Sequence, residues 1–129
     1  MAVRIVRLGS ARLKDEGLRM GTVRRPPRGV PKGKFASENW YDVWLPELSP
    51  SEATVKLGLK AESDADWKAF ARRYAKEMSA PTAGRLLELL AALSREADFS
   101  VGCYCEDEAR CHRSVLRGLL RDRGVKVVS

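Results

Sequence analysis

The last thirty residues of this 129-residue chain constrain its fold most strongly. The apolar run over 99–105 predicts a buried strand, and the valine and leucine spacing over 111–123 predicts an amphipathic helix that Gly124 ends. Residues 125–128 then predict another strand. A strand, a helix and a strand in this order are expected to form a parallel unit with a right-handed crossover. This part of the chain therefore predicts an α/β fold.

The rest of the chain agrees with that class. Apolar patterning predicts extended segments at 3–8, 18–23 and 40–45, and helices at 49–60, 63–78 and 82–96. The first helix should begin with a capping box at Ser49, with Pro50 at its first position. We therefore expect one domain over residues 1–129. It would be an α/β sandwich with a parallel or mixed sheet flanked by helices, ending in the strand–helix–strand unit.

The positive charge of the chain is concentrated in its first quarter. The formal net charge is +7, and residues 1–34 contain ten Lys and Arg but only two acidic residues. Residues 24–34 hold three prolines and two glycines, which predicts a cationic loop. Such a surface attracts anions, either nucleic acid or a phosphorylated small molecule. A solvated basic face explains the composition equally well.

Cysteine usage and hydropathy indicate the compartment. No apolar stretch approaches the roughly 20 residues of a membrane span, and the N-terminus lacks the apolar core of a signal peptide. Three cysteines are an odd number and are crowded together, which argues against a structural disulfide network. We therefore expect a cytoplasmic protein that does not bind membranes.

All three cysteines and the only histidine fall within eleven residues, from Cys103 to Arg113. They follow the strand at 99–105 and lead into the helix at 111–123. Open α/β sheets usually place their ligands at such strand-to-helix turns. The turn is therefore the predicted functional site.

One interpretation of the cluster is an enzyme site for an anionic, phosphate- or nucleotide-containing substrate. A thiol at a helix N-terminus should have a lowered pKa, so Cys111 is the candidate nucleophile and His112 the acid, base or orienting group. The expected anion-binding residues are Arg113, Arg25, Arg28 and Arg24, and Cys103, Cys105 and Ser114 would have supporting roles. The spacing differs from that of the familiar cysteine phosphatase loop.

Two other interpretations stay open for the same residues. Three cysteines and a histidine match the composition of a zinc site, but neighbouring ligands on a helix diverge by about 100 degrees and the spacing is unusual. Alternatively, Cys103 and Cys105 fill the core, or switch as a redox pair.

A basic nucleic-acid-binding or accessory module is the alternative function. Arg113, Arg117 and Arg121 would form one basic ridge along the last helix, next to the N-terminal charge. A solvent-facing helix side is the ordinary explanation of such a ridge. A binder should lose affinity steeply with salt and tolerate Cys111→Ser, whereas an enzyme should not tolerate that change.

Four motifs occur in order along the chain. They are R-x-P-R-G at 25–29, W-L-x-x-L-x-P-S at 44–51, W-x-x-F-x-x-x-Y at 67–74 and C-x7-C-H-R-x-x-L at 103–116. With a short N-terminal strand, they make the chain resemble the bacterial domain-of-unknown-function family 488. The resemblance implies an α/β fold and no established activity. Cys105 stands where relatives usually carry another residue, and Pro26 and Pro27 replace a bulkier apolar residue.

Overall fold

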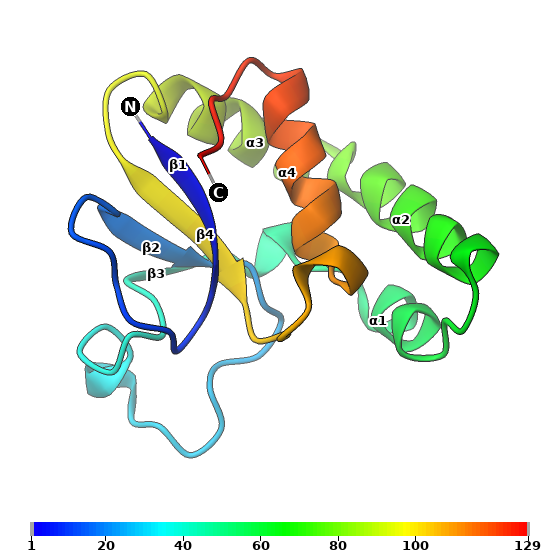
Figure 1. Ribbon diagram of the computed structural model, residues 1–129, viewed down its shortest axis with the longest axis horizontal. Coiled ribbons are helices and arrows are strands. Elements are labelled where there is room, and N and C mark those ends of the chain that lie inside the picture. The colour runs from blue at the N-terminus through cyan, green and yellow to red at the C-terminus, as the bar shows by residue number, and fades with distance from the viewer. Residues whose placement is uncertain (1, 129) are drawn as a thin grey trace.

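A four-stranded sheet in the order β1-β4-β2-β3 forms one half of the molecule (Figure 1). The computed structural model describes residues 2–128. Its strands are β1 (Val3–Arg7), β2 (Leu18–Gly21), β3 (Val43–Trp44) and β4 (Phe99–Cys103). β4 pairs in parallel with β1 and β2, and β3 pairs in parallel with β2. The predicted α/β class is confirmed, with a parallel sheet.

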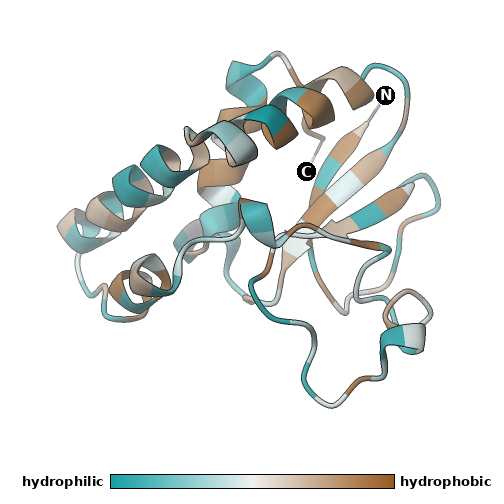
Figure 2. Ribbon diagram, turned by 180° about the vertical axis from the view of Figure 1, so that it is seen from behind, coloured by the Kyte–Doolittle hydropathy of each residue, from teal (hydrophilic) through white to brown (hydrophobic). Residues whose placement is uncertain are grey.

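Four α-helices form the other half. They are α1 (Glu52–Leu59), α2 (Asp64–Met78), α3 (Pro81–Leu93) and α4 (His112–Asp122). The main core joins Val3 and Val101 of the strands to Tyr74, Leu87 and Leu116 of the helices, all at most 1% exposed. Figure 2 shows hydrophobic and hydrophilic residues alternating along these helices, as their periodicity predicts. The helices therefore bury one face of the sheet.

The first helix begins two residues later than predicted. Its N-cap is Ser51, whose Oγ accepts a hydrogen bond from the Thr54 backbone N–H, and Pro50 precedes the helix. The carboxylate of Glu77 on α2 accepts from the Ser51 backbone N–H at 2.8 Å and from the hydroxyls of Ser51 and Thr54 at 2.6 Å. A carboxylate from a distant helix thus fixes this start, so Ser49 is not the cap.

The predicted strand at 125–128 is replaced by an isolated bridge. Val127 pairs in parallel with Val3 at the outer edge of β1, and the Val128 N–H donates to the Val3 carbonyl at 2.8 Å. Gly124, with φ of +81°, turns the chain after α4, as its position predicts. The expected parallel direction is present, but the pairing is too short to form a strand.

Candidate functional site

Five predicted site residues meet at the carboxyl edge of the sheet. β4 ends at Cys103, its continuation carries Cys105, and Cys111 caps α4, which begins with His112 and Arg113. Because β1, β2 and β4 are parallel, the segments that follow them reach the same edge. We call Cys103, Cys105, Cys111 and His112 the Cys–His cluster.

The three thiols of the cluster interact with one another. The Sγ atoms of Cys103 and Cys111 lie 2.8 Å apart, and both side chains are buried. Cys105 is exposed. Hydrogen bonds from the thiols of Cys103 and then Cys111 hold the pKa of Cys105 well below its usual range, with the charge of Arg113 adding to the effect. The exposed member of the trio is therefore the one whose thiolate form is favoured.

The pKa of the Cys111 thiol differs from the prediction. Its hydrogen bond with Cys103 lowers the pKa of the Cys111 thiol, but its hydrogen bond to Cys105 and its burial outweigh that effect and raise the pKa. The prediction of a lowered pKa is wrong, because the helix N-terminus is buried and the neighbouring Cys105 holds the charge. Ser114, expected to support the site, donates its hydroxyl to the Cys111 carbonyl at 3.0 Å.

His112 connects the cluster to the end of β2. Its Nε2 lies 2.9 Å from the Thr22 carbonyl and 3.0 Å from the Thr22 hydroxyl, and its Nδ1 lies 3.6 Å from the Cys111 Sγ. The Tyr74 ring packs edge-on against the imidazole at 5.3 Å between centroids. Burial lowers the pKa of His112 to about 4, so the ring is neutral at pH 7. The donor atoms of Cys103, Cys111 and His112 lie within 4.8 Å of one another, close enough to hold a metal.

Arg113 lies beside the thiols and is 3% exposed. It donates from a terminal nitrogen to the Cys105 carbonyl at 2.5 Å, and its Nε finds no hydrogen-bond partner within residues 2–128. Burying a guanidinium is costly unless opposite charge lies nearby. Burial would lower the pKa of Arg113, but the neighbouring Cys103, Cys111 and Glu108 outweigh burial and raise it, so the guanidinium stays charged beside the cluster.

A cavity of about 670 Å³ opens next to the cluster, at the ends of β1 and β4. Its lining consists of Arg7, Leu8, Gly9, Ser10, Arg25, Pro26, Pro27, Arg28, Trp40 and Tyr104. Leu8 also packs in one buried group with Cys103 and Cys111. The predicted anion-binding residues are thus divided: Arg25 and Arg28 line the cavity, Arg113 lies with the thiols, and Arg24 is exposed outside both.

The aromatic wall of the cavity is held by close contacts. The rings of Trp40 and Tyr104 pack edge-to-face, with centroids 5.9 Å apart. Gly9 has φ of +92°, and a Cβ at this position would lie 3.0 Å from the Trp40 ring. A glycine is therefore needed both for the turn and for the space that Trp40 occupies.

Comparison with known families decides what kind of domain this is. The family model DUF488-N3a, described as the active DUF488-N3 subclade, matches residues 3–124. This chain belongs to the DUF488 family. The comparisons with curated proteins and with solved structures found no match. The four motifs thus predicted the family correctly.

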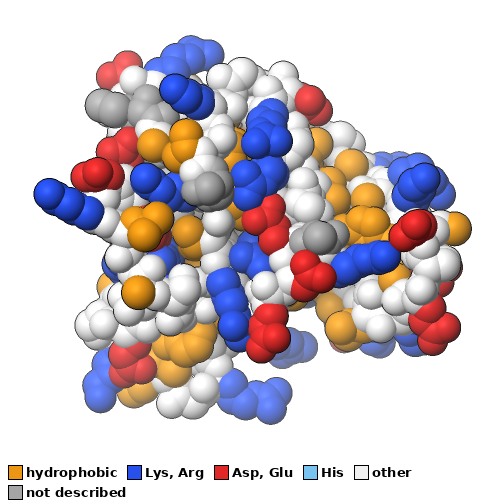
Figure 3. All heavy atoms as spheres, viewed as in Figure 1, with side chains coloured by type: hydrophobic (Ala, Val, Ile, Leu, Met, Phe, Trp, Pro, Cys, Tyr) orange, Lys and Arg blue, Asp and Glu red, His pale blue; other side chains and the backbone are white. Residues whose placement is uncertain are grey.

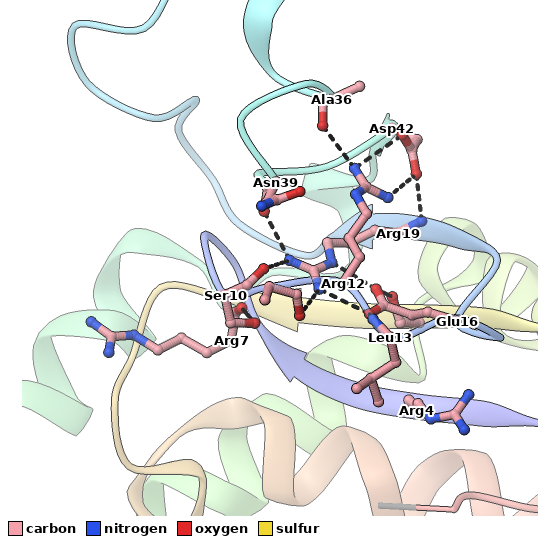
Figure 4. Close-up of polar contacts among 12 residues, drawn as sticks. Arg4, Arg7, Ser10, Arg12, Leu13, Glu16, Arg19, Ala36, Asn39 and Asp42 are labelled. Atoms are coloured by element: carbon pink, nitrogen blue, oxygen red, sulfur yellow. Dashed lines mark hydrogen bonds and ion pairs between the residues drawn. The ribbon is translucent and has the colours of Figure 1, made fainter.

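In this DUF488 protein a buried ion pair supports the cavity from the face of the sheet that the helices leave free. Arg19 on β2 and Glu16 are 0% and 1% exposed, with Nε and Oε2 2.7 Å apart. Arg19 also donates to the carbonyls of Ser10 and Asn39, each at 2.8 Å (Figure 4). The pair therefore fixes the two loops that carry Ser10 and Trp40 of the cavity wall. The sequence carries no signal for this role, since both residues look like ordinary surface charges.

The basic ridge expected along α4 of the DUF488 protein is interrupted. Arg113 is buried, and Arg117 makes two hydrogen bonds to the carboxylate of Glu108, at 2.7 and 2.8 Å. In Figure 3 acidic side chains lie among the basic ones down the middle of this face. α4 therefore offers no continuous cationic track. None of the helices within residues 2–128 is both long and apolar enough to cross a membrane.

Proposed function

We propose that this DUF488 protein is an enzyme acting on a phosphate-bearing small molecule in the cavity at the carboxyl edge of the sheet. The lining of the cavity carries the proposal, because it combines three arginines with two aromatic rings. Guanidinium groups match phosphate oxygens in charge and geometry, and rings stack on a planar group such as a base. The volume lies within the range of about 300–1,000 Å³ that is usual for small-molecule sites.

The chemical step is assigned to the neighbouring Cys–His cluster: its exposed thiol, Cys105, would meet the substrate, and the buried Cys111 and His112 would support the thiolate form of Cys105. Leu8 lines the cavity and also packs in one buried group with Cys103 and Cys111. Cys105 is the exposed thiol of the cluster. The arrangement supports separate roles for the two groups: the cavity arginines would bind the anion, and the Cys–His cluster would carry out the reaction.

Calorimetric titration with inorganic phosphate, adenosine and AMP tests the recognition step. We expect AMP to bind more tightly than phosphate and adenosine to bind weakly. Arg25→Ala or Arg28→Ala should each weaken AMP binding about tenfold, the effect of losing about 1.4 kcal/mol. Arg85→Ala, an exposed arginine on α3, is the matched control. Equal binding by all three variants, or no binding of any phosphate compound, would overturn the proposal.

Turnover separates an enzyme from the alternative, a nucleic-acid-binding module. For an enzyme, Cys111→Ser should keep the affinity for AMP-like ligands and abolish turnover in a screen of nucleotides and sugar phosphates. For a module, a single-stranded oligonucleotide should bind with a steep salt dependence that Cys111→Ser leaves unchanged. The interrupted ridge on α4 favours the enzyme, because Arg113 and Arg117 are already engaged within the protein.

A further inference from the structure

We propose that the Cys–His cluster is a zinc site, with Cys103, Cys111 and His112 as buried ligands and Cys105 as the fourth ligand on the exposed side. The donor atoms of the three buried residues lie within 4.8 Å of one another. Cys105 stands outside this group of three, but the thiols of Cys103 and Cys111 lie near enough to lower its pKa, so it is the candidate for the fourth ligand. Thiolate sulfur and imidazole nitrogen in a set of four are the donors that zinc prefers.

Adjacent ligands are feasible here because Cys111 is not helical. It is the N-cap of α4, with φ −132° and ψ 155°, and only His112 takes the helical conformation. The divergence of about 100 degrees between neighbours applies within a helix and does not apply across this junction. The Cys111 Sγ and the His112 Nδ1 accordingly converge to 3.6 Å.

The imidazole is oriented as a ligand needs to be. The Thr22 carbonyl, 2.9 Å from Nε2, accepts a hydrogen bond and so fixes the proton on Nε2. The lone pair of Nδ1 then faces the sulfurs. A histidine ligand typically donates its other ring N–H to a carbonyl in this way, which fixes its tautomer and direction.

The buried guanidinium of Arg113, next to the cluster, supports the zinc site independently of the distances between the ligands. Arg113 is buried; it donates to the Cys105 carbonyl; the Cys111 thiol and the Glu108 carboxylate lie near enough to raise its pKa; and its Nε has no hydrogen-bond partner within residues 2–128. A zinc ion with three thiolates and one neutral imidazole has a net charge of −1. Arg113 would neutralise this charge. Zinc binding would therefore keep the charge of Arg113 balanced.

Metal binding requires small adjustments of the thiols. Zinc–sulfur bonds of about 2.3 Å place tetrahedral sulfurs about 3.8 Å apart, so Cys103 and Cys111 would separate from their present 2.8 Å. Each thiol that becomes a ligand releases one proton to solvent. The inference depends on the cluster alone and stands whether or not the cavity binds phosphate. With zinc bound the thiols and the imidazole are ligands, so the chemical step of the proposed function belongs to the metal-free cluster.

Cobalt(II) titration of the reduced full-length chain, followed by displacement with zinc, tests the site. We expect one equivalent to bind with intense sulfur-to-cobalt charge-transfer absorption, and zinc to raise the midpoint of thermal unfolding. Cys103→Ser, Cys111→Ser and His112→Ala should each weaken binding at least a hundredfold. Cys105→Ser should still bind one equivalent of cobalt, with about tenfold lower affinity, because the ligand that this variant lacks lies at the surface.

Two controls keep the outcomes distinct. Far-ultraviolet circular dichroism establishes that each metal-free variant is folded, and Arg25→Ala should bind cobalt like the wild type because it alters only the cavity. Absence of stoichiometric binding by the reduced wild type would overturn the inference. So would binding that Cys111→Ser and His112→Ala, both folded, leave unchanged. A zinc site with no phosphate binding would refute the proposed substrate class but not this inference.

Discussion

The hydroxyl of Tyr104 donates a hydrogen bond to the backbone carbonyl of Arg25 at 2.8 Å, across 79 positions of the chain. Tyr104 follows β4, and Arg25 belongs to the cationic loop that follows β2. The bond therefore connects the segment between two cluster cysteines to the loop that carries two cavity arginines. It couples the two halves of the candidate site.

Tyr104→Phe should weaken phosphate binding without unfolding the protein. The loss of one hydrogen bond of about 0.5–1.5 kcal/mol frees the Arg25 loop, so AMP affinity should fall about two- to tenfold in calorimetric titration. Tyr41→Phe is the matched control, because the buried Tyr41 hydroxyl has no partner within residues 2–128. Equal affinities for the two variants would show that the Tyr104 bond does not organise the cavity.

Because of Glu16, the free energy of unfolding should fall as the pH is lowered below 4.5. Burial alone would raise the pKa of Glu16, but hydrogen bonds from Arg19, Ser100 and the Leu13 backbone outweigh burial and lower it from 4.5 to about 2. Below pH 4.5 the unfolded chain binds a proton that the folded chain does not, so the free energy of unfolding should fall by about 3 kcal/mol between pH 4.5 and 2. Urea unfolding at several pH values measures this loss.

Glu16→Gln should remove that part of the pH dependence. It should also lower the free energy of unfolding at pH 7 by about 3–5 kcal/mol, because Arg19 is left buried without its carboxylate. Glu47→Gln changes an exposed carboxylate and serves as the control. A Glu16→Gln variant as stable as the control would show that the buried pair contributes no net stability.

Substitution by alanine should have opposite effects on stability at two glycines that the sequence does not distinguish, Gly21 and Gly118. A Cβ on Gly21 would lie 2.4 Å from the Tyr41 ring, whereas one on Gly118 in α4 meets no atom within 4 Å. Gly21→Ala should therefore lower the free energy of unfolding by about 1–3 kcal/mol, and Gly118→Ala should raise it by about 1 kcal/mol. Urea denaturation of both variants checks the signs. A stabilising Gly21→Ala would contradict the close packing of Tyr41 on β2.

The elements that follow hydrophobic periodicity were predictable from the sequence. Strands β1, β2 and β4, the helices and the location of the Cys–His cluster depend on local patterns that tertiary contacts reinforce. Contacts between distant segments were not predictable. Glu77 moves the start of α1 to Ser51, and the Thr22 carbonyl orients His112 from 90 residues away. Nothing in the sequence around Glu77 or Thr22 indicates these contacts.

The electrostatics of the site were less predictable than its location. A charge in the sequence does not reveal whether it is solvated, so Arg19 and Arg113 were grouped with exposed basic residues although both are buried. The extended backbone of Cys111 decides whether neighbouring side chains converge, and a motif does not specify it. The thiolate form is accordingly favoured at Cys105, whereas proximity to the helix N-terminus had predicted it at Cys111.

Oxidation should distinguish the buried thiols of the metal-free chain from the exposed one. The Sγ atoms of the buried Cys103 and Cys111 are 2.8 Å apart. Diamide should therefore remove one hydrogen from each of these two thiols and join them in a disulfide. Iodoacetamide should then modify only Cys105. Peptide mass spectrometry identifies both products. Cys105→Ser should still form the disulfide, Cys111→Ser should lose it, and bound zinc should prevent it because both thiolates are then ligands. A disulfide that includes Cys105 in the wild type would contradict this arrangement of the cluster.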